Sequence, residues 1–358
     1  MSTKTNVMTE KQRIEALLNR HVPDRVPLWP FVPNGFAVVY SGLTVADAYT
    51  NPEGLYNSLR QTARDFGWVF YPVMVYAAYG AWEFGGDVRM PTGRYDQAPV
   101  VTRHPIEKDE DVYNLKWPGP ESGFVPTARK FAALARQEDL DNKPFQATIA
   151  AGVAYGLACQ VAGFNRILKW LIRKPGLAHD LIRQISEWSL AGLPAQKEAL
   201  GVDGVLGACG GPTGSNQLIS AKQFEEFALP DIKEGQARLR ALGYKNTYVH
   251  ICGEHNDNLP YWAQVDFGDP GIIGIGPEIS LERAAEFFPH DIILGNLNPA
   301  LIQTGTPEEV YEATRRCVET GKKLGGRYIF SPGCDLPPRA PAENVRMMSK
   351  AVEDHGWY

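Results

Sequence analysis

Residues 248–255 read Tyr-Val-His-Ile-Cys-Gly-Glu-His, and the rest of the chain can be interpreted outward from this stretch. Side chains alternate between the two faces of an extended strand, so His250 and Cys252 point the same way. A further thiol, Cys334, follows another apolar run, within Ser331-Pro-Gly-Cys-Asp335. One imidazole and two thiolates leave the fourth position of a tetrahedral zinc ion open. This pattern is typical of a catalytic zinc site and differs from a closed structural one.

The alternative interpretation is two buried free cysteines and a hydrogen-bonded core histidine. It is a common arrangement, because free cysteine is among the most buried residue types. Where the three residues lie relative to the strands of the fold distinguishes the two interpretations.

Eight apolar runs of strand length alternate with helical patterns along the chain. They span residues 25–32, 67–75, 145–151, 204–209, 247–252, 271–275, 291–296 and 327–331. Each later crossover is long enough for a parallel sheet, which predicts a (β/α)8 TIM barrel, with a doubly wound α/β sheet as the alternative. Residues 76–117 form a long excursion that we expect to be an elaborated loop with a hairpin. With no internal repeat and no linker, residues 1–358 are expected to form one domain.

In a parallel barrel, reactive groups lie at the carboxyl ends of the strands. His250 and Cys252 end the fifth predicted strand, and Cys334 follows the eighth. These strands are not neighbours, so the loop 331–336 must fold over the barrel mouth, and Pro332-Gly333 supplies a suitable turn. A shared zinc ion requires the two sulfurs to lie within roughly 6 Å of each other. On this basis we predict a zinc site at His250, Cys252 and Cys334.

Other polar residues are expected at the same rim. Glu278 follows the sixth strand and Asn296 ends the seventh, and we assign both as candidate catalytic residues that orient a ligand or a substrate oxygen. Capping of the following helices is the alternative role. Gln146 in the third strand is grouped with them, and His255 is expected to be a solvated residue at a helix start.

Aromatic residues are dense in the first third of the chain. Several follow the first two predicted strands, where loops face the pocket, and such a lining suits a flat apolar substrate. The candidate substrate-binding residues are Trp29, Phe31, Phe36, Tyr79 and Trp82. Packing in the hydrophobic core is the alternative for each of them.

Composition excludes several classes of protein. The 358 residues are 44% hydrophobic and 22% charged, which is typical of a globular chain. A net charge of −5 and a pI near 5.9, without a long basic run, argue against nucleic acid as a partner. The polar N-terminus and the absence of an apolar run of about 18 residues predict a cytoplasmic protein without a membrane span. Neither a dinucleotide-binding glycine motif nor a Walker sequence is present, so a nucleotide cofactor is not expected.

Several motifs together resemble one family. They are Asp24-Arg-Val-Pro27, Ala81-Trp-Glu-Phe-Gly85, Gln223-Phe-Glu-Glu-Phe227 with Pro230, Val249-His-Ile-Cys-Gly253, Gly295-Asn-Leu-Asn-Pro299 and Ser331-Pro-Gly-Cys334. In order and wording they resemble the uroporphyrinogen decarboxylase superfamily, and within it the zinc-dependent, corrinoid-linked methyltransferases. In those methyltransferases the H-x-C and the distant cysteine supply the zinc ligands, which map here onto His250, Cys252 and Cys334.

The resemblance implies a TIM barrel, a Zn²⁺ cofactor, and a partner protein that carries a corrinoid (cobalamin), with a dimer as a further expectation. The decarboxylases carry an Arg-Gln-Ala-Gly-Arg stretch after the first strand, whereas residues 29–36 here contain no arginine. Porphyrinogen decarboxylation is therefore disfavoured. The aromatic loops favour O-demethylation of a methoxylated aromatic ether. The alternatives are methyl transfer from a methylcobamide to a thiol such as coenzyme M, a metal-free decarboxylase or lyase on the same barrel, and a non-catalytic metal-binding scaffold.

Overall fold

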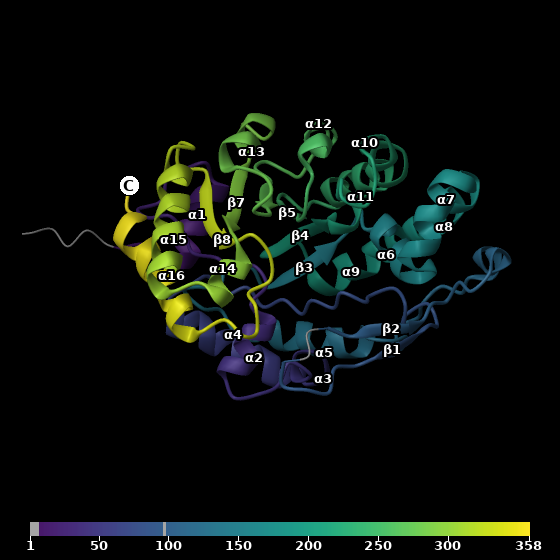
Figure 1. Cartoon of the computed structure of the whole chain (residues 1–358), viewed down its shortest axis with the longest axis horizontal. Helices are drawn as coiled ribbons and strands as arrows, with labels where there is room; N and C mark the ends of the chain where they lie inside the picture. Colours follow the sequence, from purple (N-terminus) through teal and green to yellow (C-terminus); the bar gives the residue numbers. More distant parts are fainter. Residues whose placement is uncertain (1–6, 96–97) are drawn as a thin grey trace, which may run out of the picture.

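The computed structural model of the chain describes residues 7–95 and 98–358, and its centre is a parallel sheet of six strands. The strands follow one another in chain order, as β3 (Ala147–Ala150), β4 (Val205–Gly210), β5 (Thr247–Ile251), β6 (Ile272–Ile275), β7 (Ile292–Leu297) and β8 (Tyr328–Pro332). In Figure 1 the sheet runs through the middle of the molecule. These strands coincide within a few residues with the third to eighth predicted runs.

The first two predicted strands, residues 25–32 and 67–75, do not form regular strands, and this part of the prediction was wrong. Isolated backbone hydrogen bonds remain: Trp29 N donates to Phe330 O at 2.9 Å, Phe330 N donates to Pro27 O at 3.0 Å, and Val69 N donates to Leu28 O at 2.8 Å. Prolines 27, 30, 33 and 72 have no N–H to donate and interrupt the ladders. The backbone still follows the path of a (β/α)8 barrel. Residues 25–32 and 67–75 take the places of its first two strands, and we call them the first and second irregular staves.

Helices surround the sheet. Figure 1 shows α15 and α16 at one end of the molecule, α7 and α8 at the other, and α2 to α5 along one edge. The α-helices are α1 (Glu10–Leu18), α2 (Asn34–Tyr40), α3 (Asp47–Thr50), α4 (Pro52–Phe66), α5 (Val125–Ala135), α6 (Ala154–Ala162), α7 (Phe164–Arg173), α8 (Pro175–Ala191), α9 (Leu193–Leu200), α10 (Ala221–Gln223), α11 (Leu229–Ala241), α12 (Leu259–Trp262), α13 (Leu281–Phe287), α14 (Pro299–Thr304), α15 (Pro307–Lys322) and α16 (Ala342–His355).

The predicted long excursion contains a short antiparallel hairpin of β1 (Asp87–Arg89) and β2 (Val100–Arg103), as expected. Between α10 and α11 the chain forms a π-helical turn, Phe224–Ala228. Pro230 explains this turn, because a proline has no N–H for the carbonyl four residues earlier.

Two hydrophobic layers hold the barrel together. The interior of the barrel is filled by aromatic and β-branched side chains, among them Trp29, Tyr71, Phe145, Tyr248 and Ile292, all at most 6% exposed. A larger core packs the outer face of the sheet against the helices. The interior is thus a packed core, and access to its chemistry is confined to the ends of the strands.

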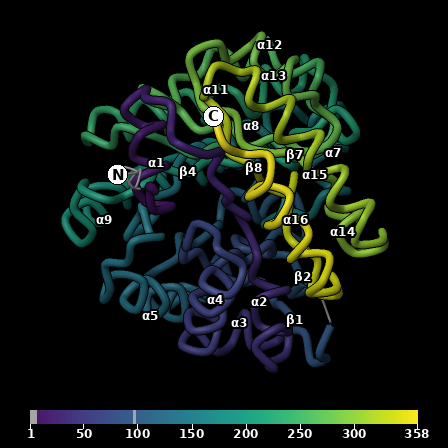
Figure 2. The backbone as a smooth tube through the Cα atoms, turned by 90° about the vertical axis from the view of Figure 1, so that its left-hand side faces the viewer, coloured from purple at the N-terminus to yellow at the C-terminus, as the bar shows by residue number. Residues whose placement is uncertain are grey.

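The two ends of the described chain meet beside the first irregular stave. Val26 N donates to Gly356 O at 2.9 Å, and Tyr358 N donates to Asp24 O at 3.1 Å. Figure 2 shows the C-terminus next to this N-terminal segment. Within residues 7–95 and 98–358, no helix is both long and apolar enough to cross a bilayer.

Candidate metal centre

Strand β5 carries His250, and Cys252 follows directly after its last residue. The alternation of the strand directs both side chains to the same face, as predicted. Cys334 comes from the loop after β8, and two backbone hydrogen bonds hold that loop: Gly333 N to Leu297 O at 2.8 Å and Leu336 N to Val32 O at 2.9 Å. This loop carries Cys334 to the carboxyl end of β5.

The three predicted ligands come together in the structure. Their ligand atoms all lie within 4.8 Å of one another, and each residue is half-buried. The sulfurs of Cys252 and Cys334 are 3.4 Å apart. Two zinc–sulfur bonds of about 2.3 Å at a tetrahedral angle would place the sulfurs about 3.8 Å apart, so the cluster needs little adjustment to hold a zinc ion.

The two thiols share a proton. A hydrogen bond from Cys252, together with the nearby His250, lowers the pKa of the Cys334 thiol against the effect of burial. The pKa of Cys252 is raised by the same hydrogen bond, by burial, and by the charges of Cys334 and Glu278. The arrangement therefore favours the thiolate form of Cys334, and a thiolate is the form that binds zinc.

Glu278 and Asn296 lie at the same end of the barrel, with different surroundings. Glu278 is exposed, and its Oε2 would lie 2.5 Å from a β-carbon placed on Gly276, beside the backbone of Cys252. Asn296 donates its side-chain N–H to Ile279 O at 2.7 Å, so it braces the loop after β6. Asn298, close to Asn296 in the sequence, caps α14 by accepting a hydrogen bond from Ala300 N.

The five candidate substrate-binding aromatics occupy different places. Phe31 is half-buried, and its ring centroid lies 4.5 Å from that of His250, one of the three predicted zinc ligands. Trp29 is fully buried inside the barrel, and Phe36 is buried against Tyr40 and Phe66 between α2 and α4. We assign packing roles to Trp29 and Phe36, because neither ring faces an open surface.

Tyr79 and Trp82 lie on the loop that follows the second irregular stave. Tyr79 is half-buried near Tyr76, and Trp82 is 39% exposed. Burial raises the pKa of Tyr79 to about 12, with a contribution from the carboxylate of Glu83, so its hydroxyl stays protonated. These contacts include none of the three predicted ligands, and the substrate-binding role of both side chains stays a prediction.

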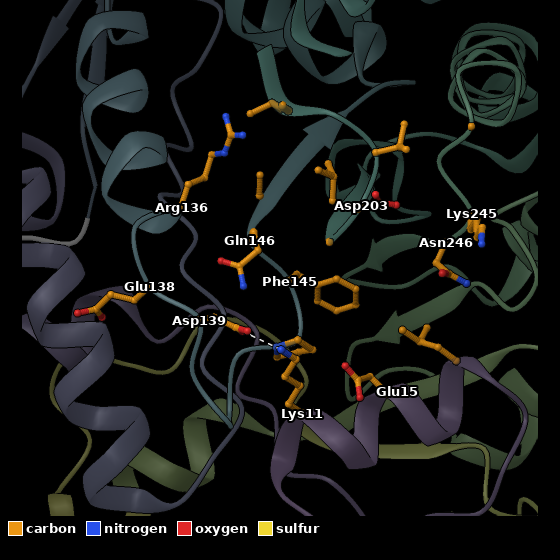
Figure 3. A pocket seen from close by; sticks show the side chains of 18 of the residues that line it. Lys11, Glu15, Arg136, Glu138, Asp139, Phe145, Gln146, Asp203, Lys245 and Asn246 are labelled. Carbon is orange, nitrogen blue, oxygen red and sulfur yellow. Dashed lines mark hydrogen bonds and ion pairs between the residues drawn. The ribbon is translucent and has the colours of Figure 1, made fainter. Parts of the chain in front are cut away.

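Two expectations about polar residues were wrong. His255 is fully buried, with its Nδ1 accepting hydrogen bonds from Asn258 and Trp262, and is not a solvated helix start. Gln146 precedes β3 at the amino end of the strands, where it lines a cavity of about 780 Å³ (Figure 3). That cavity lies at the end of the barrel away from the cysteines, and charges of both signs line it, including a Lys11–Asp139 ion pair at 2.7 Å.

Sequence reasoning missed Tyr248, whose hydroxyl lies 3.2 Å from His250 Nδ1. The alternation of the strand could have predicted this proximity, because Tyr248 precedes His250 by two residues and so lies on the same face.

Comparison with known proteins places the chain in a family. The profile of the uroporphyrinogen decarboxylase (URO-D) family matches residues 9–355, and the chain belongs to this family.

Among its relatives are two kinds of enzyme. The methylcobamide:CoM methyltransferase MtbA of Methanosarcina acetivorans is 24% identical over 350 residues, which cover 97% of this chain and 98% of the relative. The uroporphyrinogen decarboxylase of Chlorobaculum tepidum is 26% identical over 261 residues, covering 70% of each. A solved methyltransferase from Methanosarcina mazei matches the fold with a TM-score of 0.78 and 22% identity, over 97% of this chain and 99% of that one. The predicted barrel fold is thereby confirmed.

Proposed function

We propose that this protein is a zinc-dependent methyltransferase that transfers a methyl group from the cobalt of a corrinoid protein to a thiol. The observation that carries the proposal is the cluster of His250, Cys252 and Cys334 at the carboxyl end of β5. The similarity to methylcobamide:CoM methyltransferases over nearly the whole chain supports the direction toward a thiol.

The donor set suits zinc. His250, Cys252 and Cys334 would hold the ion, which when bound supplies a Lewis acid that lowers the pKa of a substrate thiol at neutral pH. The proton shared by Cys252 and Cys334 would leave as the ion enters, so that loading releases protons. The ring of Phe31 packs beside the His250 imidazole at a centroid distance of 4.5 Å.

Decarboxylation of a porphyrinogen fits the site less well. Its substrate carries several carboxylates, which need cationic partners such as arginine. Residues 29–36 contain no lysine or arginine, and the apolar ring of Phe31 lies beside His250.

The corrinoid is assigned to a partner protein. The three ligand residues are half-buried and lie at the end of the barrel. A cobalt-bound methyl group can reach a substrate there only if the corrinoid protein covers this end, so we expect the partner to dock on the loops that follow β5 and β8.

A second candidate is O-demethylation of a methoxylated aromatic ether, with the methyl group passing to the corrinoid. The position of Phe31 beside His250 favours an aromatic substrate. The relatives named for coenzyme M favour the thiol instead, and we rank the ether second.

The test combines metal analysis with a transfer assay. We expect about one zinc ion per chain in the purified protein, and demethylation of free methylcobalamin in the presence of small thiols. The Cys252→Ala and Cys334→Ala variants should lose both the zinc and the activity. Cys317→Ala is the matched control, since Cys317 is a half-buried cysteine on α15 outside the cluster.

The outcomes separate the alternatives. Transfer from guaiacol-type ethers to reduced cobalamin, without transfer to thiols, would favour the second candidate. Activity that survives complete removal of the metal would point to a metal-free lyase and overturn the proposal. Zinc binding without turnover of any methyl donor would indicate a non-catalytic scaffold.

A further inference from the structure

Tyr248 lies inside the barrel, one layer of side chains below the three proposed zinc ligands. It precedes His250 by two residues on β5, so both side chains point inward from the same face of the strand. The tyrosine is 2% exposed, and its hydroxyl oxygen lies 3.2 Å from His250 Nδ1. A buried phenol needs a hydrogen-bond partner, and the imidazole of a proposed metal ligand is the partner found here.

The neighbouring strand leaves room for this contact. Gly274 of β6 is paired with His250 in the sheet, and a β-carbon at position 274 would lie 2.6 Å from the Tyr248 hydroxyl oxygen. Real β-carbons do not come so close, so any side chain at this position would displace the phenol. The hydroxyl reaches Nδ1 because residue 274 is a glycine.

Phe31 restrains both rings. Its centroid is 4.7 Å from that of Tyr248 and 4.5 Å from that of His250. The ring of Trp29 packs against Tyr248 from inside the barrel, at 6.0 Å. Packing on two sides limits rotation of the phenol and keeps its hydroxyl directed at the imidazole.

We propose that Tyr248 is a positioning residue of the metal centre, whose hydroxyl oxygen accepts the Nδ1 proton of His250 and so leaves Nε2 as the nitrogen that binds the metal. A neutral imidazole has one donor and one acceptor nitrogen, and a phenol oxygen can accept from the donor. Metal-bound histidines usually donate their second N–H to such an outer partner, which sets the tautomer and the ring orientation. The inference rests on the proposed zinc site, but not on the identity of the methyl acceptor.

The test is the Tyr248→Phe variant, which keeps the ring and removes only the hydroxyl. Zinc affinity, measured by competition with a chromophoric chelator, should fall about 10- to 100-fold, the usual loss when an outer partner of a ligand is removed. In the cobalt(II)-substituted protein, the visible absorption bands should shift, because the imidazole is no longer held in one orientation.

Tyr244→Phe is the matched control. Tyr244 is also 2% exposed, and its hydroxyl donates to Gly201 O at 3.0 Å in a contact that includes no predicted ligand. The control should unfold at lower denaturant concentration, as a loss of one buried hydrogen bond predicts, but should keep wild-type zinc affinity and the wild-type cobalt spectrum.

Equal zinc affinity in wild type, Tyr248→Phe and Tyr244→Phe would overturn the role of Tyr248 while leaving the zinc site intact. If wild type itself binds no zinc, the proposed function fails first. Should Tyr248→Phe not fold, Gly274→Ala tests the same contact, because its methyl group would push the hydroxyl away from Nδ1 and should also weaken zinc binding. Unchanged affinity in folded Gly274→Ala would contradict the proposal.

Discussion

His255 is a buried titratable side chain three residues after Cys252, one of the proposed zinc ligands. Its Nδ1 accepts hydrogen bonds from Asn258 at 2.9 Å and from Trp262 at 3.2 Å. Burial lowers its pKa from 6.5 to about 4, so the imidazole is neutral in the native protein at neutral pH. Charging it would place a cation in the core, where the cost of burial outweighs the attraction of the nearby Glu254 carboxylate.

This pKa shift predicts a pH-dependent stability. Between about pH 6.5 and pH 4 the unfolded chain binds a proton that the native protein does not, so the stability is complete above pH 6.5 and falls as the pH is lowered. A shift of this size corresponds to a loss on the order of 3 kcal/mol. Urea unfolding of the metal-free protein across this range should show the loss, and His255→Gln should reduce the slope. An identical slope in the variant would contradict the assignment.

At the scale of secondary-structure elements, α11 packs closely against the loop between β3 and α6, and this close packing requires a glycine at position 235. A β-carbon on Gly235 would lie 2.3 Å from Gly152 N and 2.7 Å from Gly152 Cα. Both contacts are with backbone, which cannot move aside as a flexible side chain could. Helix propensity favours alanine at this position, and the tertiary contact opposes it.

We therefore expect Gly235→Ala to destabilise the protein by about 1–3 kcal/mol, as overpacking usually does. Gly176→Ala is the matched control, because Gly176 is also helical but an added β-carbon there would meet nothing within 4 Å outside the backbone of its own helix. The control should be neutral or should gain up to about 1 kcal/mol. Equal unfolding midpoints for the two variants in urea would contradict the expectation that α11 is too close to Gly152 to admit a methyl group.

At the scale of the whole molecule, a buried charge cluster joins the two ends of the chain. Glu10 on α1 accepts hydrogen bonds from Arg13 at 2.6 Å and from Arg25, and Arg13 also binds Asp24 at 2.7 Å. Both guanidinium groups lie over the ring of Trp357, at 5.8 and 5.7 Å. The cluster therefore holds α1, the first irregular stave and the C-terminal end together.

Removal of the central carboxylate leaves the half-buried Arg25 without this partner and leaves the buried Arg13 with Asp24 alone. We expect Glu10→Ala to lower the free energy of unfolding by about 3–5 kcal/mol, the usual cost of breaking a buried pair. Glu15→Ala, at an exposed position of the same helix, should change it by less than about 0.5 kcal/mol. Zinc binding by the folded fraction of both variants should match the wild type, since the charge cluster includes none of the three ligands. A small effect of Glu10→Ala would show that water reaches these charges.

Local patterns predicted much of the barrel. The third to eighth strands are short apolar runs, a pattern consistent with fully buried strands of a parallel sheet. The first two predicted strands are irregular in the structure because their prolines break the hydrogen-bond ladder while leaving the hydrophobicity of the runs unchanged. The single-domain organisation and the zinc ion remain predictions.

The order of residues along β5 was enough to put His250 and Cys252 on one face, because the alternation of a strand is a local property of the backbone. Burial of His255 and Phe36 and the hydrogen bond between Tyr248 and His250 could not be read in this way. The 3.4 Å separation of Cys252 and Cys334 depends on closure of the barrel and on the path of the loop after β8. Such contacts join residues far apart in the chain, and their distances are set by packing across the whole fold, which no local pattern encodes.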